Sequence, residues 1–214
     1  MYFCFINQKN NIMFKKIFIL ILSVITLTSF TILTHQDHVK VNTETSTVKW
    51  TGSKVTSSHE GDIKIKSGKL ILDHGRLVGG EFEIDMTTIV NTDIENQESR
   101  NNLEGHLKNK DFFGVENHPT SDLKITKVDA LKIVDQNGNN YAVVADLTIK
   151  GITHSIIFNA NVKIKGAAFL AIAKIKIDRT KWDIKYNSGS FFDGLGNYLI
   201  LDEIEFDVFL LSEK

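Results

Sequence analysis

Apolar and polar residues alternate along most of the chain from Val39 onward. A typical segment is Phe82-Glu83-Ile84-Asp85-Met86, in which every second side chain is apolar and those between carry charge. Because successive side chains of a β-strand point to opposite faces, this period predicts strands with one face in the core. Strands of this one-sided kind are typical of antiparallel sheets. The other predicted inward positions are Val48 and Trp50; Ile63 and Ile65; Leu147 and Ile149; Phe158, Ala160, Val162 and Ile164; Ile175 and Ile177; Ile204, Phe206 and Val208.

Turn-forming pairs separate these segments. The pairs are Ser67-Gly68, His74-Gly75, Gly79-Gly80, Asn137-Gly138 and Lys165-Gly166, and each predicts a tight connection between neighbouring strands. Many short strands with tight turns favour a sandwich or a barrel. We count roughly eight strands, the number at which a closed barrel can still hold one small ligand. No linker or repeat divides this region, so residues 37–214 are predicted to form one domain, an all-β antiparallel barrel.

One stretch departs from the period of two. Residues 93–110 are rich in Glu, Gln, Asn and Lys, and Leu103 and Leu107 stand four positions apart. A spacing of four places two side chains on the same face of a helix. We therefore expect a short helix near Asn101–Lys110, inserted between two strands.

The N-terminus reads as an export signal. Lys15 and Lys16 precede an apolar run that begins at Ile17 and continues to Leu33. A basic start followed by such a run is typical of a secretory signal peptide. Residues 1–36 are assigned to this signal, and Met13 is the better start, which would leave residues 1–12 upstream of the true one. The alternative is a single membrane anchor, because the run approaches spanning length. We expect a periplasmic or secreted protein without stable membrane insertion after cleavage.

Composition and motifs exclude several classes of function. The 25 basic and 26 acidic side chains nearly balance, so no basic surface for nucleic acid is indicated. The single cysteine, Cys4, cannot form an intramolecular disulfide. The chain lacks the G-x-S-x-G and H-E-x-x-H motifs, so we predict no catalytic residues and no enzymatic activity. His59, His106 and His118 could converge in space, but their spacing does not indicate a metal site, and we predict no metal and no cofactor.

The aromatic residues are the main candidates for binding. Trp50, Phe82, Phe158 and Phe206 follow the strand period and face inward, which fits core packing as well as ligand contact. The adjacent pairs Phe112-Phe113 and Phe191-Phe192 differ, because neighbouring side chains of a strand point to opposite sides. One ring of each pair then needs a second apolar environment, such as a pocket opening or a helix packed over the barrel end. The chain also carries Asp178-Arg179, for which we expect a local ion pair at a strand end.

Seven strings in order along the exported part resemble the YceI-like family. They are VKWTGSKV, SSHEGDIKIKSGKLIL, GGEFEIDMTTIVNTD, HLKNKDFFGVENHPTS, ADLTIKGITHSIIF, KIKIDRTKWDIKY and a closing amphipathic strand. Each string alone is weak, whereas the ordered series is specific and covers about Val41–Leu211. The resemblance departs at Trp182, where the family often has a smaller aromatic residue, a difference that concerns the shape of the pocket and not the fold.

The resemblance implies a lipocalin-like barrel that encloses a long apolar lipid such as a polyisoprenoid. It transfers no catalytic residue. We therefore predict an exported protein that holds an isoprenoid or fatty-acyl lipid for transport, storage or stress response; a homodimer stays open. Two alternatives are an enzyme acting on such a lipid and a structural domain whose core is filled. The predicted ligand-binding residues are Trp50, Phe82, Ile84, Met86, Phe112, Phe113, Leu147, Ile149, Phe158, Val162, Phe191 and Phe192.

Overall fold

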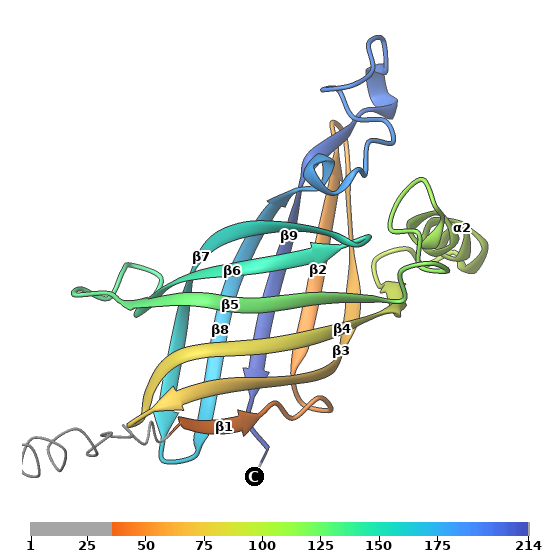
Figure 1. Cartoon of the computed structure of the whole chain (residues 1–214). Coiled ribbons are helices and arrows are strands. Elements are labelled where there is room, and N and C mark those ends of the chain that lie inside the picture. Colours follow the sequence, from red (N-terminus) through yellow and green to blue (C-terminus); the bar gives the residue numbers. More distant parts are fainter. Residues whose placement is uncertain (1–35, 214) are drawn as a thin grey trace, which may run out of the picture. The chain divides into compact units, whose positions relative to one another are not determined.

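A closed antiparallel barrel dominates the computed structural model, which describes residues 36–213 (Figure 1). The strands follow the order β1-β3-β2-β9-β8-β7-β6-β5-β4, and a further pairing of β3 with β4 closes eight of them into a ring. Every pairing between strands is antiparallel. The predicted barrel of about eight strands with a short helix is therefore confirmed.

The elements have the following bounds: β1 Gln36–Lys40, β2 Thr47–Lys54, β3 Ser58–Asp73, β4 Arg76–Asn91, α2 Gln97–Lys108, β5 Thr120–Ala130, β6 Tyr141–Ile149, β7 Ile152–Lys165, β8 Ala168–Asp178, η1 Arg179–Trp182, η2 Gly196–Tyr198 and β9 Ile200–Leu211. β1 lies outside the ring and pairs with the second half of β3. The first half of β3 pairs with β2 instead. The long strand β3 thus pairs with β2 and then with β1 along the same edge.

Two of the predicted turns are wrong. Ser67-Gly68 lies inside β3 and Gly79-Gly80 lies inside β4, so neither pair separates two strands. The glycines serve close packing, because a Cβ on Gly68 would lie 2.7 Å from the ring of Phe82, its partner across the strands. The ladder between β3 and β4 also shifts register between Ile65 and Ser67. Glycine and bulges inside strands commonly mark the bends that a barrel needs.

The other three predicted turns lie between strands. His74-Gly75 joins β3 to β4, Asn137-Gly138 lies between β5 and β6, and Lys165-Gly166 begins the connection from β7 to β8. His74 and Gly75 both have positive φ, 49° and 73°, as the favoured two-residue hairpin turn requires. Apolar side chains of the alternating segments point into the barrel and form one continuous core with the cap residues described below.

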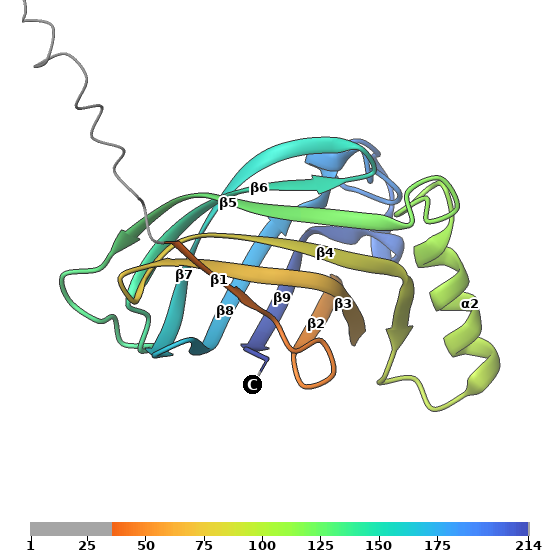
Figure 2. The same cartoon turned by 60° about the horizontal axis from the view of Figure 1, so that its bottom comes forward.

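The predicted helix is confirmed as α2, which begins four residues earlier than expected. Asn96 caps it, since its side chain accepts a hydrogen bond of 2.9 Å from the backbone N–H of Ser99. Leu107 is buried and Leu103 is half-buried, so the two leucines face the barrel as their spacing predicts. Figure 2 shows α2 beside the barrel end at which β4 finishes and β5 starts.

The N-terminal predictions concern residues outside the described range. The signal peptide over residues 1–36, with the start at Met13, falls almost wholly on residues 1–35, which lie outside that range. No helix within residues 36–213 combines the length and the apolar character that a bilayer-crossing segment needs.

Candidate functional site

The barrel encloses an apolar cavity with about 180 Å³ of space for the centre of a water-sized sphere. All eight strands of the ring contribute inward side chains to its wall, mainly Ile, Leu, Val, Phe, Ala and Met. Trp50 also lines it, with its indole N–H satisfied by the carbonyl of Val90 at 3.1 Å. A wall of this composition favours hydrocarbon over water.

The predicted ligand-binding residues divide cleanly. Ten of them line the cavity: Trp50, Phe82, Ile84, Met86, Phe112, Phe113, Leu147, Ile149, Phe158 and Val162. Phe191 and Phe192 do not, and their side chains are 48% and 52% exposed. The structure therefore brings together the residues predicted from alternation and leaves one aromatic pair on the surface.

Two segments lie at one end of the barrel, and we call it the capped end. The first segment, residues 92–119, contains α2 and is called the helical cap. The second, residues 183–199, is called the aromatic loop. Figures 1 and 2 place both near the end of the barrel opposite the turn between β7 and β8. A ring contact joins them, with the centroids of His106 and Tyr186 4.4 Å apart.

Phe112 and Phe113 close the cavity from the helical cap. They lie in turns that follow α2, and both rings are buried, 6% and 5% exposed. Backbone hydrogen bonds fix these turns, from Phe112 N–H to Asn109 O at 3.0 Å and from Phe113 N–H to Leu107 O at 3.1 Å. The assumption that adjacent rings must point to opposite sides was wrong here, because it holds for a strand and not for a turn.

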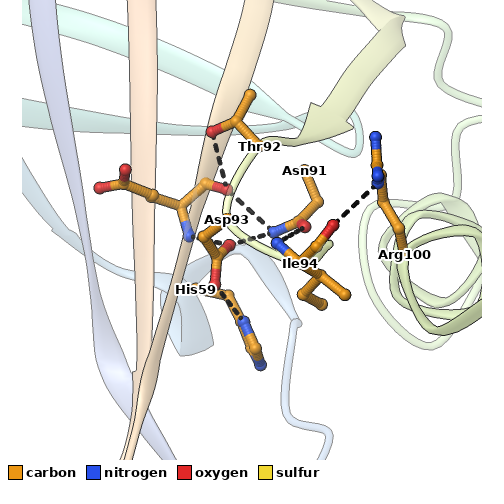
Figure 3. Close-up of polar contacts among 7 residues, drawn as sticks. His59, Asn91, Thr92, Asp93, Ile94 and Arg100 are labelled. Atoms are coloured by element: carbon orange, nitrogen blue, oxygen red, sulfur yellow. Dashed lines mark hydrogen bonds and ion pairs between the residues drawn. The ribbon is translucent and has the colours of Figure 1, made fainter. Parts of the chain in front are cut away.

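A polar network anchors the start of the helical cap to the barrel (Figure 3). Asn91 is buried at the end of β4, and its amide donates to Glu60 O at 2.9 Å and to the Asp93 carboxylate. Asp93 also accepts from the backbone N–H of Glu60 at 3.0 Å and lies 2.8 Å from Nδ1 of His59. Burial tends to raise the pKa of Asp93, but these hydrogen bonds outweigh it and hold the pKa below 3.8.

Arg179 is the one charged residue in the cavity wall among residues 36–213, and its side chain is fully buried. Its guanidinium donates to the carbonyls of Ile184, Ile200 and Leu201 at 2.7, 3.0 and 3.1 Å. Burial lowers the pKa of Arg179. The Asp202 carboxylate, whose Oδ1 lies 3.4 Å from Nη2 of Arg179, acts in the opposite direction and raises it. The guanidinium also lies over the ring of Phe112, 5.7 Å from its centroid. Arg179 thus ties the aromatic loop, β9 and the helical cap together.

The expected surface ion pair of Asp178 with Arg179 was wrong. Asp178 caps η1 instead, accepting from the N–H and the hydroxyl of Thr180 at 3.0 and 2.6 Å. The adjacent arginine turns inward and pairs with Asp202. A neighbouring acid in the sequence could not reveal a partner that β9 supplies from elsewhere in the chain.

Trp182, the departure from the family pattern, lies outside the cavity wall. Its side chain is buried, its indole N–H donates to Leu147 O at 3.1 Å, and its ring packs edge-on against His154 at 5.3 Å. His154 in turn donates to Lys181 O at 2.9 Å. The larger aromatic residue therefore braces η1 against β6 and β7 and contributes no side chain to the cavity wall.

The histidines considered as metal ligands do not converge. His59 pairs with Asp93, His106 contacts Phe112 and Tyr186, and His118 lies beside Gly114 and Gly151. No group of three or more His, Cys, Asp or Glu within residues 36–213 is arranged to hold a metal ion.

Sequence reasoning missed the two polar residues of the cavity wall, Ser121 and Arg179. Ser121 begins an alternation with Leu123 and Ile125 that could have placed it inward. It pairs with Ile84 across β4 and β5. Arg179 likewise stands two positions after Ile177, on the inward side of the β8 alternation, but its charge argued against an inward position.

Comparisons with known proteins agree with this architecture. Residues 39–210 match the model of the YceI-like domain. The chain resembles a UPF0312 protein of Photorhabdus laumondii with 34% identity over 80 residues, which span 34% of this chain and 38% of that protein.

Two solved structures share the fold. The first, BcnA of Burkholderia cenocepacia, has a TM-score of 0.61 and 18% identity, and the match covers 81% of this chain and 99% of BcnA. The second, from Saccharophagus degradans, is described as a polyisoprenoid binding domain implicated in plant cell wall breakdown. Its TM-score is 0.58 with 14% identity, covering 81% of this chain and 97% of that one. The family match spans nearly the whole barrel, and the chain therefore belongs to the YceI-like family.

Proposed function

We propose that this chain is an exported binding protein that holds one long apolar lipid, of isoprenoid or fatty-acyl type, inside the barrel and releases it unchanged. The observation that carries the proposal is the cavity, whose wall is apolar except at Ser121 and Arg179. The choice of an isoprenoid is supported by the similar fold of the Saccharophagus degradans domain, which is described as polyisoprenoid binding. Export rests on Lys15-Lys16 and the apolar run that follows them.

The size of the cavity suits a linear tail. The open space, about 180 Å³ for the centre of a water-sized sphere, has a wall to which all eight strands of the ring contribute. Burying one methylene contributes about 0.8 kcal/mol, so about ten of them can offset the entropic cost of association. The tail would then supply most of the affinity, and polar contacts would set selectivity.

A lipid-modifying enzyme was the alternative, and it would be favoured by a histidine and a carboxylate converging inside the cavity. Among residues 36–213, no histidine, aspartate or glutamate lines the cavity. Arg179 is held by three carbonyls and Asp202, which suits a structural role. The open space inside the barrel likewise argues against a purely structural domain with a filled core.

Gly52 offers a direct test of the cavity. It lines the wall on the inward face of β2, and a Cβ added there would meet nothing within 4 Å. Gly52→Phe should therefore fold normally and fill part of the cavity with its ring. Thr51→Phe is the matched control, because Thr51 is the next residue of β2 and its side chain points to the opposite face.

We would purify the wild type and both variants natively, extract them with organic solvent and measure the lipid by mass spectrometry. The wild type and Thr51→Phe should carry the same long-chain lipid, and folded Gly52→Phe should carry much less or a shorter one. An unchanged lipid load in folded Gly52→Phe would place the binding site outside the barrel.

A further inference from the structure

Ser121 is a polar group in an apolar wall with no hydrogen-bond partner. It is the second residue of β5, its side chain is 5% exposed, and it lines the cavity. The hydroxyl oxygen is buried and bonds to no atom of residues 36–213. A buried hydroxyl left unpaired costs about 1–3 kcal/mol, which alanine at this position would avoid. The position therefore points to a partner that enters the cavity from outside the chain.

Polar atoms without a hydrogen bond gather at the capped end. Within residues 36–213, the buried side-chain atoms lacking a hydrogen-bond partner are Ser121 Oγ, His106 Nε2 and Asp202 Oδ1, and the last of these forms the ion pair with Arg179. Ser121 lies two positions after the helical cap, His106 belongs to α2, and Asp202 lies near the start of β9, just after the aromatic loop. Of these three residues, only Ser121 lines the cavity.

The opposite end of the cavity is pure hydrocarbon. Leu77, Val143, Val162, Ala171 and Leu210 line it, each in the part of its strand nearest the opposite end. An amphiphilic ligand gains most when its polar oxygen lies beside the single unpaired hydroxyl and its tail lies against these side chains. The wall thus favours one orientation of the ligand, with its polar head at the capped end and its tail at the opposite end.

Charge restricts the head further. Arg179 is the one cation in the described wall, and Asp202 already balances it at 3.4 Å. Its N–H groups donate to three backbone carbonyls, and Ser190 in turn holds Asp202 through a hydrogen bond of 2.6 Å. A phosphate or carboxylate in this cavity would bring a charge that no free cation neutralises, which is costly in an apolar site.

We propose, building on the lipid-binding function above, that the ligand carries an uncharged oxygen-containing head, an alcohol or a ketone, which hydrogen-bonds to Ser121 at the capped end while the tail points toward the turn between β7 and β8. Ser121 then selects among apolar lipids, and the barrel discriminates against both plain hydrocarbons and anionic lipids.

Three probes with one isoprenoid chain separate these possibilities: geranylgeraniol, the same chain without the hydroxyl, and geranylgeranyl diphosphate. The full-length protein, freed of bound lipid on a hydrophobic resin, would be titrated with each while tryptophan fluorescence is followed, since Trp50 lines the cavity. The variant is Ser121→Ala. The control is Ser155→Ala, an exposed serine of β7.

The wild type should bind the alcohol about tenfold more tightly than the hydrocarbon, as one satisfied buried hydroxyl predicts. It should bind the diphosphate more weakly than the alcohol. Ser121→Ala should abolish the preference for the alcohol and retain the affinity for the hydrocarbon, and Ser155→Ala should change neither.

Equal affinities of the wild type for alcohol and hydrocarbon, or an unchanged preference in Ser121→Ala, would overturn the assignment of the head while leaving lipid binding intact. Tightest binding of the diphosphate would overturn the uncharged head. Failure of all three probes to bind would overturn this inference and the isoprenoid form of the proposed function together.

Discussion

The two Phe-Phe pairs of this chain look alike in the sequence, but one pair is buried and the other is half exposed. Phe112 and Phe113 are buried in the helical cap and close the cavity, whereas about half of the surface of Phe191 and of Phe192 is exposed on the aromatic loop. Both pairs lie in turns with local backbone hydrogen bonds. The turn alone therefore does not decide burial.

What differs is the anchoring of each segment to the barrel. The helical cap is held by the Asn91 and Asp93 network at its start and by Leu107 on its inner face. In the aromatic loop the anchors are the buried residues Ile184 and Ser188 and the side-chain hydrogen bond from Ser190 to Asp202, while the rings of Phe191 and Phe192 stay half exposed. Packing of a whole segment against the core, and not the aromatic pair itself, determines which rings reach the ligand.

Truncating one ring of each pair tests this explanation most directly. Phe112→Ala removes a buried ring that contacts Arg179 and the cavity, so the free energy of unfolding should fall by about 3–5 kcal/mol. Phe191→Ala alters an exposed side chain and should change it by less than about 0.5 kcal/mol. Urea unfolding of both variants measures the difference. Similar losses would mean that the aromatic loop also packs as part of the core.

A second variant measures how much buried Trp182, between β8 and β9, contributes to stability. Trp182→Phe keeps an aromatic ring but removes the N–H that donates to Leu147 O. An unpaired buried carbonyl should cost about 1–3 kcal/mol, so this variant should lie between the two phenylalanine variants in stability. Its amide hydrogen exchange should increase around residues 179–184. No loss of stability would imply that Leu147 O finds another donor.

Acid should loosen the helical cap through Asp93. Its pKa is lowered in the folded protein, so the stabilisation it provides is complete above the ordinary aspartate pKa of 3.8 and is lost as the pH falls through the lowered value. Unfolding measured between pH 6 and pH 2.5 should therefore show a steeper acid loss in the wild type than in Asp93→Asn, which cannot titrate. Parallel pH profiles would show that the cap is anchored by other contacts.

The sequence was a good guide wherever the strand period held. Phe82, Ile84 and Met86 were placed correctly because alternation fixes the side to which each side chain points. It failed at Gly68 and Gly80, where glycine permits a bend within a strand and looks the same as a turn. It also failed for Arg179, whose partners Asp202 and Ile200 come from β9, more than twenty positions away in the chain.

The short strand β1 limits how far the N-terminus can be shortened without uncovering an edge of β3. Gln36–Lys40 cover the Lys69–Asp73 stretch of β3, and Val39 is buried in that contact. Proteolysis beyond Lys40 would leave the backbone groups of this stretch unpaired on one side. Such a free edge accepts strands from other molecules, so trimmed protein should exchange strands and aggregate. Residues 36–40 thus cover an edge of β3 that could otherwise pair with another molecule.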